Sequence, residues 1–480
     1  MPEARYLQRR TKIVCTIGPA TASPHMLQRL IRAGMDIVRL NLSHGNFKVH
    51  ADYINDIREI KGRLGIDIAI LIDLPGPKYR IGRLKGGKVT LKKGTSVNLT
   101  SADIEGSGSL LPVTLPRLGS DIKPGNIVLL DDGAMELKVV RVSGDEVRCR
   151  VAVGGVLETG KGLVVPGMKI SVPFLTPELR EALVFATRQK ADYVALSFVK
   201  EAKDIYDAKA ILKQHGADIP IIAKIERGEA VENFSEILAA CDGAMVARGD
   251  LGVELPLERV PLIQKDIIRR CNRAGKPVIT ATEMLESMIT SFRPTRAETT
   301  DVANAILDGT DAVMLSAETA IGKYPVQAVK MMVRIAHVTE KKLDYEQILA
   351  ERRSWLERET DELISYNACQ TAHRLRAAAI VAYTQTGSTA MRVSRCRPDV
   401  PILALTPIQS VACRLLLYWG VRPYLITVPT SIDEVFSLAS CLADELGYAK
   451  RGDLIVITAG VPIGEAGTTN LLKVEKVKGA

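Results

Sequence analysis

The chain has 480 residues, which is too long for one ordinary hydrophobic core, so we expect two or three domains. Its hydrophobic content of 46% and charged content of 25% are typical of a soluble globular protein, and the sequence contains neither an 18-residue apolar run nor a signal-like N-terminus; we therefore expect a cytoplasmic protein without membrane spans. The net charge is +9, but the basic residues are interspersed with 55 acidic residues, and only 4% of all residues are aromatic. We therefore expect no nucleic-acid partner.

The first 340 residues alternate short apolar runs with amphipathic helical patterns such as PHMLQRLIRAG, once residues 76–163 are set aside. Eight strands alternating with helices is the count of a (β/α)8 TIM barrel. We therefore predict an α/β fold with a catalytic barrel formed by residues 1–75 and 164–344. The predicted strands are residues 12–18, 36–44, 68–74, 193–199, 220–226, 243–252, 277–283 and 311–319.

Two segments depart from this rhythm. Residues 76–163 alternate apolar and polar side chains between glycine-rich turns, as β-hairpins do, so we predict a small β domain inserted after the third barrel strand. A charged helix is predicted over residues 338–359. The strands and helices that follow it predict an open α/β sheet within residues 345–480.

Polar residues gather where the apolar runs stop. In a (β/α)8 barrel the active site lies at the carboxyl ends of the strands, so these residues are the candidates for chemistry. They are Arg39, Asn41, Ser43 and His44 after the second run, Asp73 after the third, Lys224 and Glu226 after the fifth, Arg248 and Asp250 after the sixth, Thr280, Thr282 and Glu283 after the seventh, and Ser316 and Glu318 after the eighth. Six strands that end in polar groups are hard to explain by packing alone.

Two carboxylates on neighbouring strands, Glu226 and Asp250, are suited to one hard divalent cation, because Mg²⁺ prefers few protein oxygens and keeps positions for water and phosphate. Lys224 is two residues before Glu226 and points to the same face of its strand. Its ammonium could stabilise negative charge on a phosphoryl group or an enolate oxygen. Arg39 and Arg80 could grip phosphate oxygens. A Lys-x-Glu pair at a strand end is also often only a salt bridge.

Other patterns favour ordinary structural roles. Ser43 and His44 suggest a nucleophile and its base, but adjacent strand residues face opposite ways and would not meet. Glu318 is expected to orient a neighbour. None of the six histidines has a metal-ligand spacing, and the eight cysteines form no CxxC pair, so we expect buried thiols in a reducing compartment.

These residues and their order resemble the pyruvate kinase family along nearly the whole chain. The most specific stretch is PVITATEMLESMITSFRPTRAETTDVANAILDGTDAVMLSAETAIGKYP at residues 277–325, and VRLNLSHG, IIAKIE and AMVARGDLGVE stand in the family's order and spacing. The resemblance implies phosphoryl transfer from phosphoenolpyruvate to ADP, giving pyruvate and ATP. It also implies a Mg²⁺ cofactor, for which Mn²⁺ can substitute, and a lid role for the inserted β domain.

The resemblance also assigns roles to individual residues. Lys224 would stabilise the transition state, Arg39 would contact the substrate phosphate, and Glu226 and Asp250 would bind Mg²⁺. The substrate carboxylate would lie against Gly249, Asp250 and the Thr282 hydroxyl. The catalytic set would be completed by Thr282 and Ser316, and the nucleotide would be bound by Arg80, Lys161, Asn41 and His44.

The C-terminal segment resembles the family's effector domain. TQTGSTA places Thr384, Thr386, Gly387, Ser388 and Thr389 between a strand and a helix, a layout suited to an anion. An ordinary helix N-cap is the alternative interpretation. A phosphorylated allosteric effector is therefore expected, with the VPIGEAGTTN loop as a second contact, and the family's usual assembly implies a homotetramer.

The stretch DLPGPKYR departs from the family's pattern. Members that need K⁺ commonly read DTKGPEIR here and hold the ion with groups equivalent to Asn41, Ser43, Asp73 and the carbonyl of residue 74, which is Leu74 in this chain. Lys78 replaces the glutamate and reverses its charge. Because two cations a few Å apart repel strongly in a poorly solvated cleft, we expect the Lys78 ammonium to supply the charge that K⁺ supplies elsewhere, so that K⁺ is not required.

Two other functions stay open at this point. A class I aldolase would use Lys224 as a Schiff base, would survive metal chelation and would be trapped by borohydride. A non-catalytic sensor that kept only the effector domain should have lost some of Arg39, Lys224, Glu226, Asp250 and Thr282, and all five are present.

Overall fold

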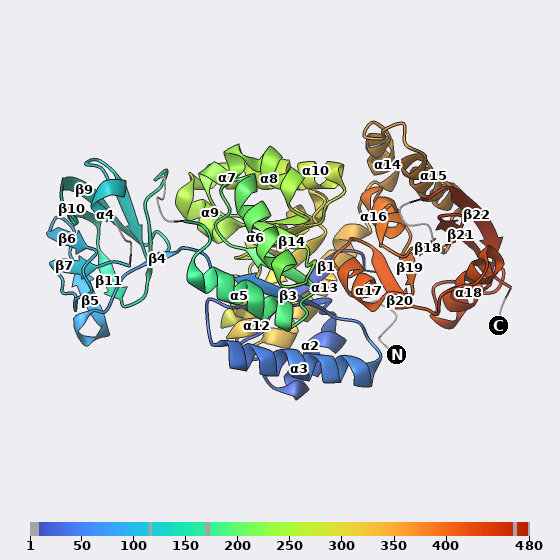
Figure 1. Cartoon of the computed structure of the whole chain (residues 1–480), viewed down its shortest axis with the longest axis horizontal. Coiled ribbons are helices and arrows are strands. Elements are labelled where there is room, and N and C mark those ends of the chain that lie inside the picture. The colour runs from blue at the N-terminus through green and yellow to red at the C-terminus, as the bar shows by residue number, and fades with distance from the viewer. Residues whose placement is uncertain (1–8, 115–117, 169–172, 464–467, 479–480) are drawn as a thin grey trace.

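The computed structural model describes residues 9–114, 118–168, 173–463 and 468–478. Figure 1 shows three parts arranged along the long axis of the molecule, with a β domain at one end, a barrel in the centre and an α/β domain at the other end. Within the described ranges, no helix combines the length and the apolar composition that crossing a membrane requires.

The central part is a closed barrel of eight parallel strands in the order β1-β17-β16-β15-β14-β13-β3-β2, which confirms the predicted fold. These strands are nearly all apolar because both of their faces are buried. Their bounds are β1 Lys12–Thr16, β2 Ile37–Asn41, β3 Ala69–Leu74, β13 Tyr193–Leu196, β14 Ile221–Ile225, β15 Gly243–Ala247, β16 Val278–Ala281 and β17 Ala312–Leu315. The sixth predicted run is too long, since the chain turns into a helix at Arg248.

Helices surround the barrel and begin at recognisable caps. In α2, for example, the Ser23 side chain accepts a hydrogen bond from the Met26 N–H, proline follows at the first helical position, and Gly34 ends the helix at φ 118°. The surrounding helices are α2 Pro24–Ala33, α3 Phe47–Leu64, α5 Pro177–Arg188, α6 Ala202–Gln214, α7 Gly228–Glu232, α8 Phe234–Ala240, α9 Arg248–Glu254, α10 Val260–Ala274, α11 Arg296–Leu307, α12 Ala317–Ala320 and α13 Pro325–Glu340, with 3-10 turns at Leu257–Arg259 and Glu286–Ile289.

The inserted part is a β domain with its own core, as the hairpin pattern predicts. Seven strands form a sheet in the order β4-β12-β8-β9-β10-β6-β7, and a bridge between Ile81 and Val113 links its two ends into a barrel-like shape. A second sheet pairs β11 with β5. The elements are β4 Tyr79–Arg80, β5 Lys88–Leu91, β6 Ser96–Thr100, β7 Leu110–Pro112, α4 Leu118–Asp121, β8 Ile127–Leu130, β9 Met135–Ser143, β10 Glu146–Val153, β11 Gly155–Glu158 and β12 Gly162–Val164, with a 3-10 turn at Lys85–Gly87.

The C-terminal part is a five-stranded sheet in the order β20-β19-β18-β21-β22, in which β22 is antiparallel to β21. The charged helix predicted over residues 338–359 is wrong as a single element: α13 ends at Glu340, and Asp344 caps a new helix by accepting a hydrogen bond from the Gln347 N–H. The elements are α14 Tyr345–Arg353, α15 Thr360–Leu375, β18 Ala379–Tyr383, α16 Ser388–Arg395, β19 Ile402–Thr406, α17 Gln409–Leu415, β20 Val421–Leu425, α18 Ile432–Glu445, β21 Leu454–Ala459 and β22 Leu471–Lys476.

Buried contacts join the barrel to the C-terminal domain. Leu416 and Leu417, just after α17, belong to the same buried cluster as the apolar side chains of the barrel interior. Beside them, the Asp36 carboxylate forms ion pairs with Arg9 at 2.7 Å and Arg422 at 2.9 Å. The C-terminal domain therefore closes one end of the barrel, and the β domain lies toward the other end (Figure 1).

Candidate active site

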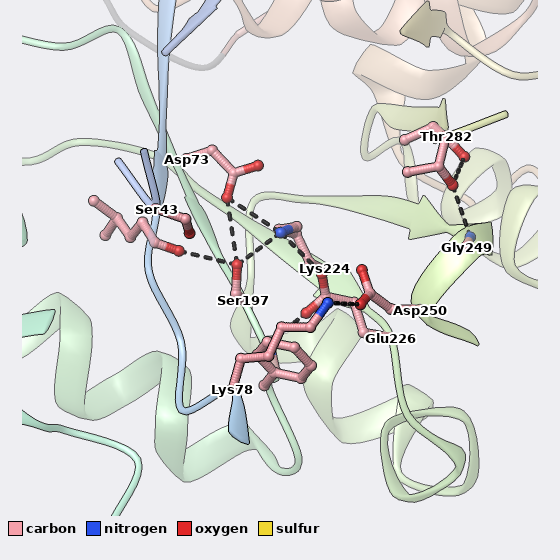
Figure 2. A network of polar contacts seen from close by, with 12 residues as sticks. Ser43, Asp73, Lys78, Ser197, Lys224, Glu226, Gly249, Asp250 and Thr282 are labelled. Atoms are coloured by element: carbon pink, nitrogen blue, oxygen red, sulfur yellow. Dashed lines mark hydrogen bonds and ion pairs between the residues drawn. The ribbon is translucent and has the colours of Figure 1, made fainter. Parts of the chain in front are cut away.

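Lys224, on β14, is the centre of a buried polar network at the carboxyl ends of the barrel strands (Figure 2). Its ammonium nitrogen donates to Ser197 Oγ at 2.6 Å and to Asp73 Oδ1 at 3.2 Å, and it lies 2.8 Å from Glu226 Oε1. Three acceptors thus match the three N–H groups of the ammonium. The side chain is held in one position by acceptors on or directly after the three strands β3, β13 and β14.

Asp73 also holds Arg39, so one carboxylate positions two cations. Arg39 Nε donates to Asp73 Oδ2 at 2.7 Å, and Arg39 Nη1 donates to Thr16 Oγ1 at 2.9 Å. Burial opposes the charge on Asp73, but Lys224 and Arg39 outweigh it and lower the pKa of the carboxyl. The site therefore presents two fixed cations with one shared buried counter-charge, an arrangement that favours an anionic ligand.

The protonation state of Lys224 separates the two chemistries left open by the sequence. Burial disfavours the charged ammonium, but the neighbouring Asp73 and Glu226 carboxylates outweigh burial and raise the pKa of Lys224 above its usual value. A Schiff-base lysine needs a neutral amine, which a raised pKa opposes. The geometry favours electrostatic stabilisation by a permanent positive charge.

Glu226 and Asp250 form the candidate metal site. Glu226 Oε2 accepts a hydrogen bond from the Phe198 N–H at 2.6 Å, and burial, with a further contribution from Asp250, raises the pKa of Glu226 to about 7 despite the opposing Lys224. Repulsion between two neighbouring carboxylates is what a divalent cation relieves. Among the described residues no group of three or more His, Cys, Asp or Glu could hold a metal, so these two carboxylates would leave coordination positions for water and substrate, which suits Mg²⁺.

Lys78 contacts this candidate metal site. Its ammonium lies 3.0 Å from Asp250 Oδ1, a barrel atom, and 3.8 Å from Asp132 Oδ1 in the β8–β9 turn of the inserted domain. Among the described residues, the Lys78 ammonium forms no hydrogen bond or ion pair with Asn41, Ser43, Asp73 or Leu74. Figure 2 shows the Lys78 ammonium directed at Asp250. Its positive charge is thus beside the predicted metal ligand.

The groups of the expected monovalent-cation cavity already have hydrogen-bond partners within the protein. Asn41 Oδ1 accepts a hydrogen bond from the Ser43 N–H at 3.2 Å, and the Leu74 carbonyl accepts one from Ser197 Oγ at 2.9 Å. Ser43 and His44 lie in a turn after β2, so the strand geometry used to separate them does not apply.

Thr282 and Gly249 form a second, smaller cluster beside the metal site. Thr282 Oγ1 accepts a hydrogen bond from the Gly249 N–H at 2.8 Å and donates one to the Ala281 carbonyl at 2.6 Å. Thr282 and Glu283 have φ values of 66° and 54°, and a β-branched residue in this left-handed region is strained. Arg248 fixes the loop by donating to the Thr282 carbonyl at 2.8 Å.

The candidate nucleotide residues lie at the junction of the barrel and the inserted domain. Arg80 Nη1 donates to the Gly160 carbonyl at 2.9 Å, and Lys161 Nζ lies 2.8 Å from Asp131 Oδ1. Burial lowers the pKa of His44, and the neighbouring cations Arg80, Arg39 and Lys78 lower it further. Cations of the barrel and of the base of the inserted domain thus lie near enough to His44 to act on its charge.

Ser316 and Glu318 follow the eighth strand. Glu318 Oε2 accepts a hydrogen bond from the Ser316 N–H at 2.7 Å, and Glu318 Oε1 accepts one from the Leu285 N–H at 3.1 Å, contacts that suit the orienting role expected for it. Ser316 Oγ is buried and forms no hydrogen bond with the described residues. Its hydrogen-bonding capacity is therefore unused within the described residues.

Two residues of the candidate site, Ser197 and Thr16, were not predicted from the sequence. They are the polar groups at the ends of the fourth and first strands, and each bonds one of the two central cations. The signal was present, because a polar residue that ends an apolar run was the criterion used for the other six strands.

The candidate effector loop precedes α16. The Thr384 hydroxyl accepts a hydrogen bond from the Gly387 N–H at 2.9 Å, Gly387 has φ 94°, and Thr386 Oγ1 donates to Ser388 Oγ at 3.1 Å. Thr389 and Thr469 share a hydroxyl contact at 2.9 Å, which joins this loop to the C-terminal one. Residues 464–467 of the VPIGEAGTTN loop lie outside the described residues.

Comparisons with known proteins cover almost the whole chain. Residues 8–329 match the family description "Pyruvate kinase, barrel domain", and residues 362–475 match "Pyruvate kinase, alpha/beta domain". A pyruvate kinase of Geobacillus stearothermophilus is 47% identical over 474 residues, covering 98% of this chain and 81% of that protein. One of Staphylococcus epidermidis is 45% identical over 471 residues, covering 98% and 80%. A crystal structure of a pyruvate kinase from Cryptosporidium parvum superposes with a TM-score of 0.93 at 37% identity, covering 99% of this chain and 97% of that one.

Proposed function

This chain belongs to the pyruvate kinase family, and we propose that the Lys224 network at the barrel mouth transfers the phosphoryl group from phosphoenolpyruvate to ADP. The observation that carries the proposal is the position of the Lys224 ammonium, which lies between Asp73 on one side and the candidate metal ligand Glu226 on the other. A cation fixed in this way costs no reorganisation when negative charge develops.

The residues divide the reaction between them. Arg39 grips the substrate phosphate, and the Lys224 ammonium stabilises the phosphoryl group while its bond to the enol oxygen breaks and a bond to an ADP phosphate oxygen forms. The substrate carboxylate lies against Gly249 and Thr282. A Mg²⁺ ion held by Glu226 and Asp250 would supply further charge neutralisation. The enolate that remains takes up one proton and becomes pyruvate.

Lys78 is proposed to replace the monovalent cation. Its ammonium is 3.0 Å from Asp250, so it places one permanent positive charge beside the metal site without a bound K⁺. A second cation close by would be repelled. Activity is therefore expected without K⁺.

The inserted domain is proposed to act as a lid that brings Arg80 and Lys161 to the nucleotide phosphates, with Asn41 and His44 on the barrel side. Arg80 lies on β4 at the base of this domain, and its Nη1 donates to the backbone carbonyl of Gly160, the residue before Lys161. Closure would keep water from the phosphoryl group.

Regulation and assembly are further parts of the proposal. The hydroxyl-rich turn of Thr384 to Thr389, with Gly387 at its bend, suits the phosphate of an allosteric effector, although its internal hydrogen bonds also fit an ordinary turn. A cytoplasmic homotetramer is the assembly expected from the family resemblance.

A coupled assay for pyruvate tests the reaction. With phosphoenolpyruvate, ADP and Mg²⁺ the enzyme should form pyruvate, chelation should abolish the activity, and borohydride with a keto substrate should trap no adduct. Lys224→Met should lower kcat by at least 10²-fold. Activity that survives chelation, or a borohydride adduct on Lys224, would contradict the proposal.

A further inference from the structure

A further candidate binding site, separate from the barrel mouth and from the effector loop, is lined by side chains on or next to α14, α15 and α16, the helices labelled in Figure 1. The void between the side chains is about 280 Å³, counted out to the open solvent. It is lined by Arg352, Trp355, Leu356, Glu362, Arg392, Arg395 and Cys396. Three arginines in one pocket indicate an anionic ligand.

Arg352 is the unusual member of this group, because it is a buried cation without a carboxylate partner. Its relative exposure is 8%, its Nε forms no hydrogen bond, and no ion pair joins it to another described residue. Its guanidinium carbon lies 3.7 Å from the centre of the Trp355 ring, against which it stacks. Glu351 and Asp311 attract it only from a longer range. A buried charge of this kind is normally paired.

The other two arginines have one carboxylate each. Arg392 pairs with Asp361, and Arg395 pairs with Glu362. Arg392 Nη1 is buried without a hydrogen-bond partner, so this side chain also keeps an unused donor. The two ion pairs are neutral as a set, and the pocket therefore retains the single positive charge of Arg352.

The charge on Arg352 is also costly to the folded protein. Burial and, to a smaller extent, the nearby Arg397 together lower the pKa of its guanidinium to about 9. An anion in the pocket would oppose both effects. This cost gives a physical reason for the site to bind a ligand and not remain empty.

We propose that this pocket binds a phosphoryl oxyanion, either free phosphate or the phosphate of a small metabolite, through Arg352, Arg392 and Arg395. Tetrahedral oxyanions suit several guanidinium donors arriving from different directions, whereas one planar carboxylate is matched by one arginine. This site is separate from the barrel mouth and does not depend on the proposed reaction.

The site would act on two regions at once. Arg392 and Arg395 lie in the last turns of α16, whose first residue, Ser388, belongs to the candidate effector loop. Arg395 also packs near Gly275 at the end of barrel helix α10, where an added Cβ would lie 3.4 Å from Arg395 Cδ. A bound anion would therefore tie the effector helix to the barrel.

Thermal unfolding in phosphate tests the proposal. Inorganic phosphate and, separately, glycerol phosphate are titrated at constant ionic strength against chloride, with wild type, Arg352→Gln and the exposed neighbour Arg353→Gln as the matched control. Ser388→Ala removes a possible contribution from the effector loop. Wild type, Arg353→Gln and Ser388→Ala should show a saturable rise in Tm, and Arg352→Gln should need at least tenfold more phosphate for half of that rise. An equal response in Arg352→Gln overturns the proposal.

The two ligands distinguish the source of the anion. Binding of both at Arg352 indicates a phosphorylated metabolite, and binding of phosphate alone indicates the free ion. A purely structural Arg352 would lower Tm in every buffer while leaving the phosphate-dependent rise intact, which also overturns the site.

A second measurement needs no variant. Wild-type crystals soaked in selenate should give an anomalous peak within hydrogen-bond distance of the Arg352 guanidinium. A carboxylate of a second copy of the chain in that position, or no peak there at a concentration that labels another site, overturns the proposal.

Discussion

Lys78→Glu reverses the charge that contacts Asp250 at the candidate metal site. The Lys78 ammonium lies 3.0 Å from Asp250, and the two side chains are 27% and 29% exposed. At an effective dielectric constant of 20 this pair would be worth about 5 kcal/mol, and its partial exposure reduces the value to about 1 to 2 kcal/mol. Reversing the charge doubles the change, to about 2 to 4 kcal/mol, or roughly 30- to 1,000-fold in rate.

The assay measures kcat/KM for phosphoenolpyruvate in tetramethylammonium and then in increasing K⁺. Wild type should be nearly indifferent to the change of cation. Lys78→Glu should lose roughly 30- to 1,000-fold without K⁺ and recover most of its activity with K⁺. Lys85→Glu is the control, because it makes the same reversal of charge at an exposed residue seven positions after Lys78; it should behave as wild type. The reasoning is refuted if K⁺ restores nothing to Lys78→Glu, or if wild type itself shows a large K⁺ requirement.

Substitutions at three further positions test the structure. Asp73→Asn removes the shared counter-charge of two cations, so kcat should fall by about 10²-fold and the free energy of unfolding by about 3 kcal/mol; a kcat within threefold of wild type would refute the positioning role. Thr282→Ala leaves the Gly249 N–H without its acceptor and should lower kcat/KM for phosphoenolpyruvate at least tenfold, whereas Thr282→Ser keeps the hydroxyl and should be nearly normal; equal losses would count against the hydrogen bond. Asp36 is buried, which opposes its charge, but its cationic neighbours lower its pKa from 3.8 to about 2. A carboxyl whose pKa is lower in the folded than in the unfolded state stabilises the fold at pH values above its unfolded-state pKa, and this stabilisation is lost as the pH falls. Between pH 5 and pH 2, the free energy of unfolding of wild type, measured with denaturant, should therefore fall by about 2 kcal/mol more than that of Asp36→Asn. Parallel pH profiles of the two proteins would contradict this.

The barrel could be predicted because parallel strands buried on both faces are continuous apolar runs, and because polar residues that end such runs stand out. Ser197 and Thr16 escaped notice since single hydroxyls at strand ends are common, and only the folded chain shows them bonded to Lys224 and Arg39. The edge strand β22, with the sequence LLKVEK, is half polar and carries no apolar run of the kind that marks the barrel strands.

Contacts between distant parts of the chain could not be predicted from the sequence. Lys78 and Asp250 are 172 residues apart, and nothing in either local pattern predicts that they meet. The same holds for Arg352, which looks like an ordinary charge on a polar helix but is buried in the fold beside Trp355 and side chains of α15 and α16. Burial of single charges depends on tertiary packing, which periodicity does not report.

The most direct test of the account is the initial rate of pyruvate formation by wild type from phosphoenolpyruvate, ADP and Mg²⁺, measured with tetramethylammonium as the sole monovalent cation and again with K⁺. A Lys224 network beside the fixed charge of Lys78 predicts Mg²⁺-dependent turnover at similar rates in both buffers. Turnover that is absent without K⁺ would contradict the role of Lys78, and no turnover in either buffer would contradict the proposed reaction.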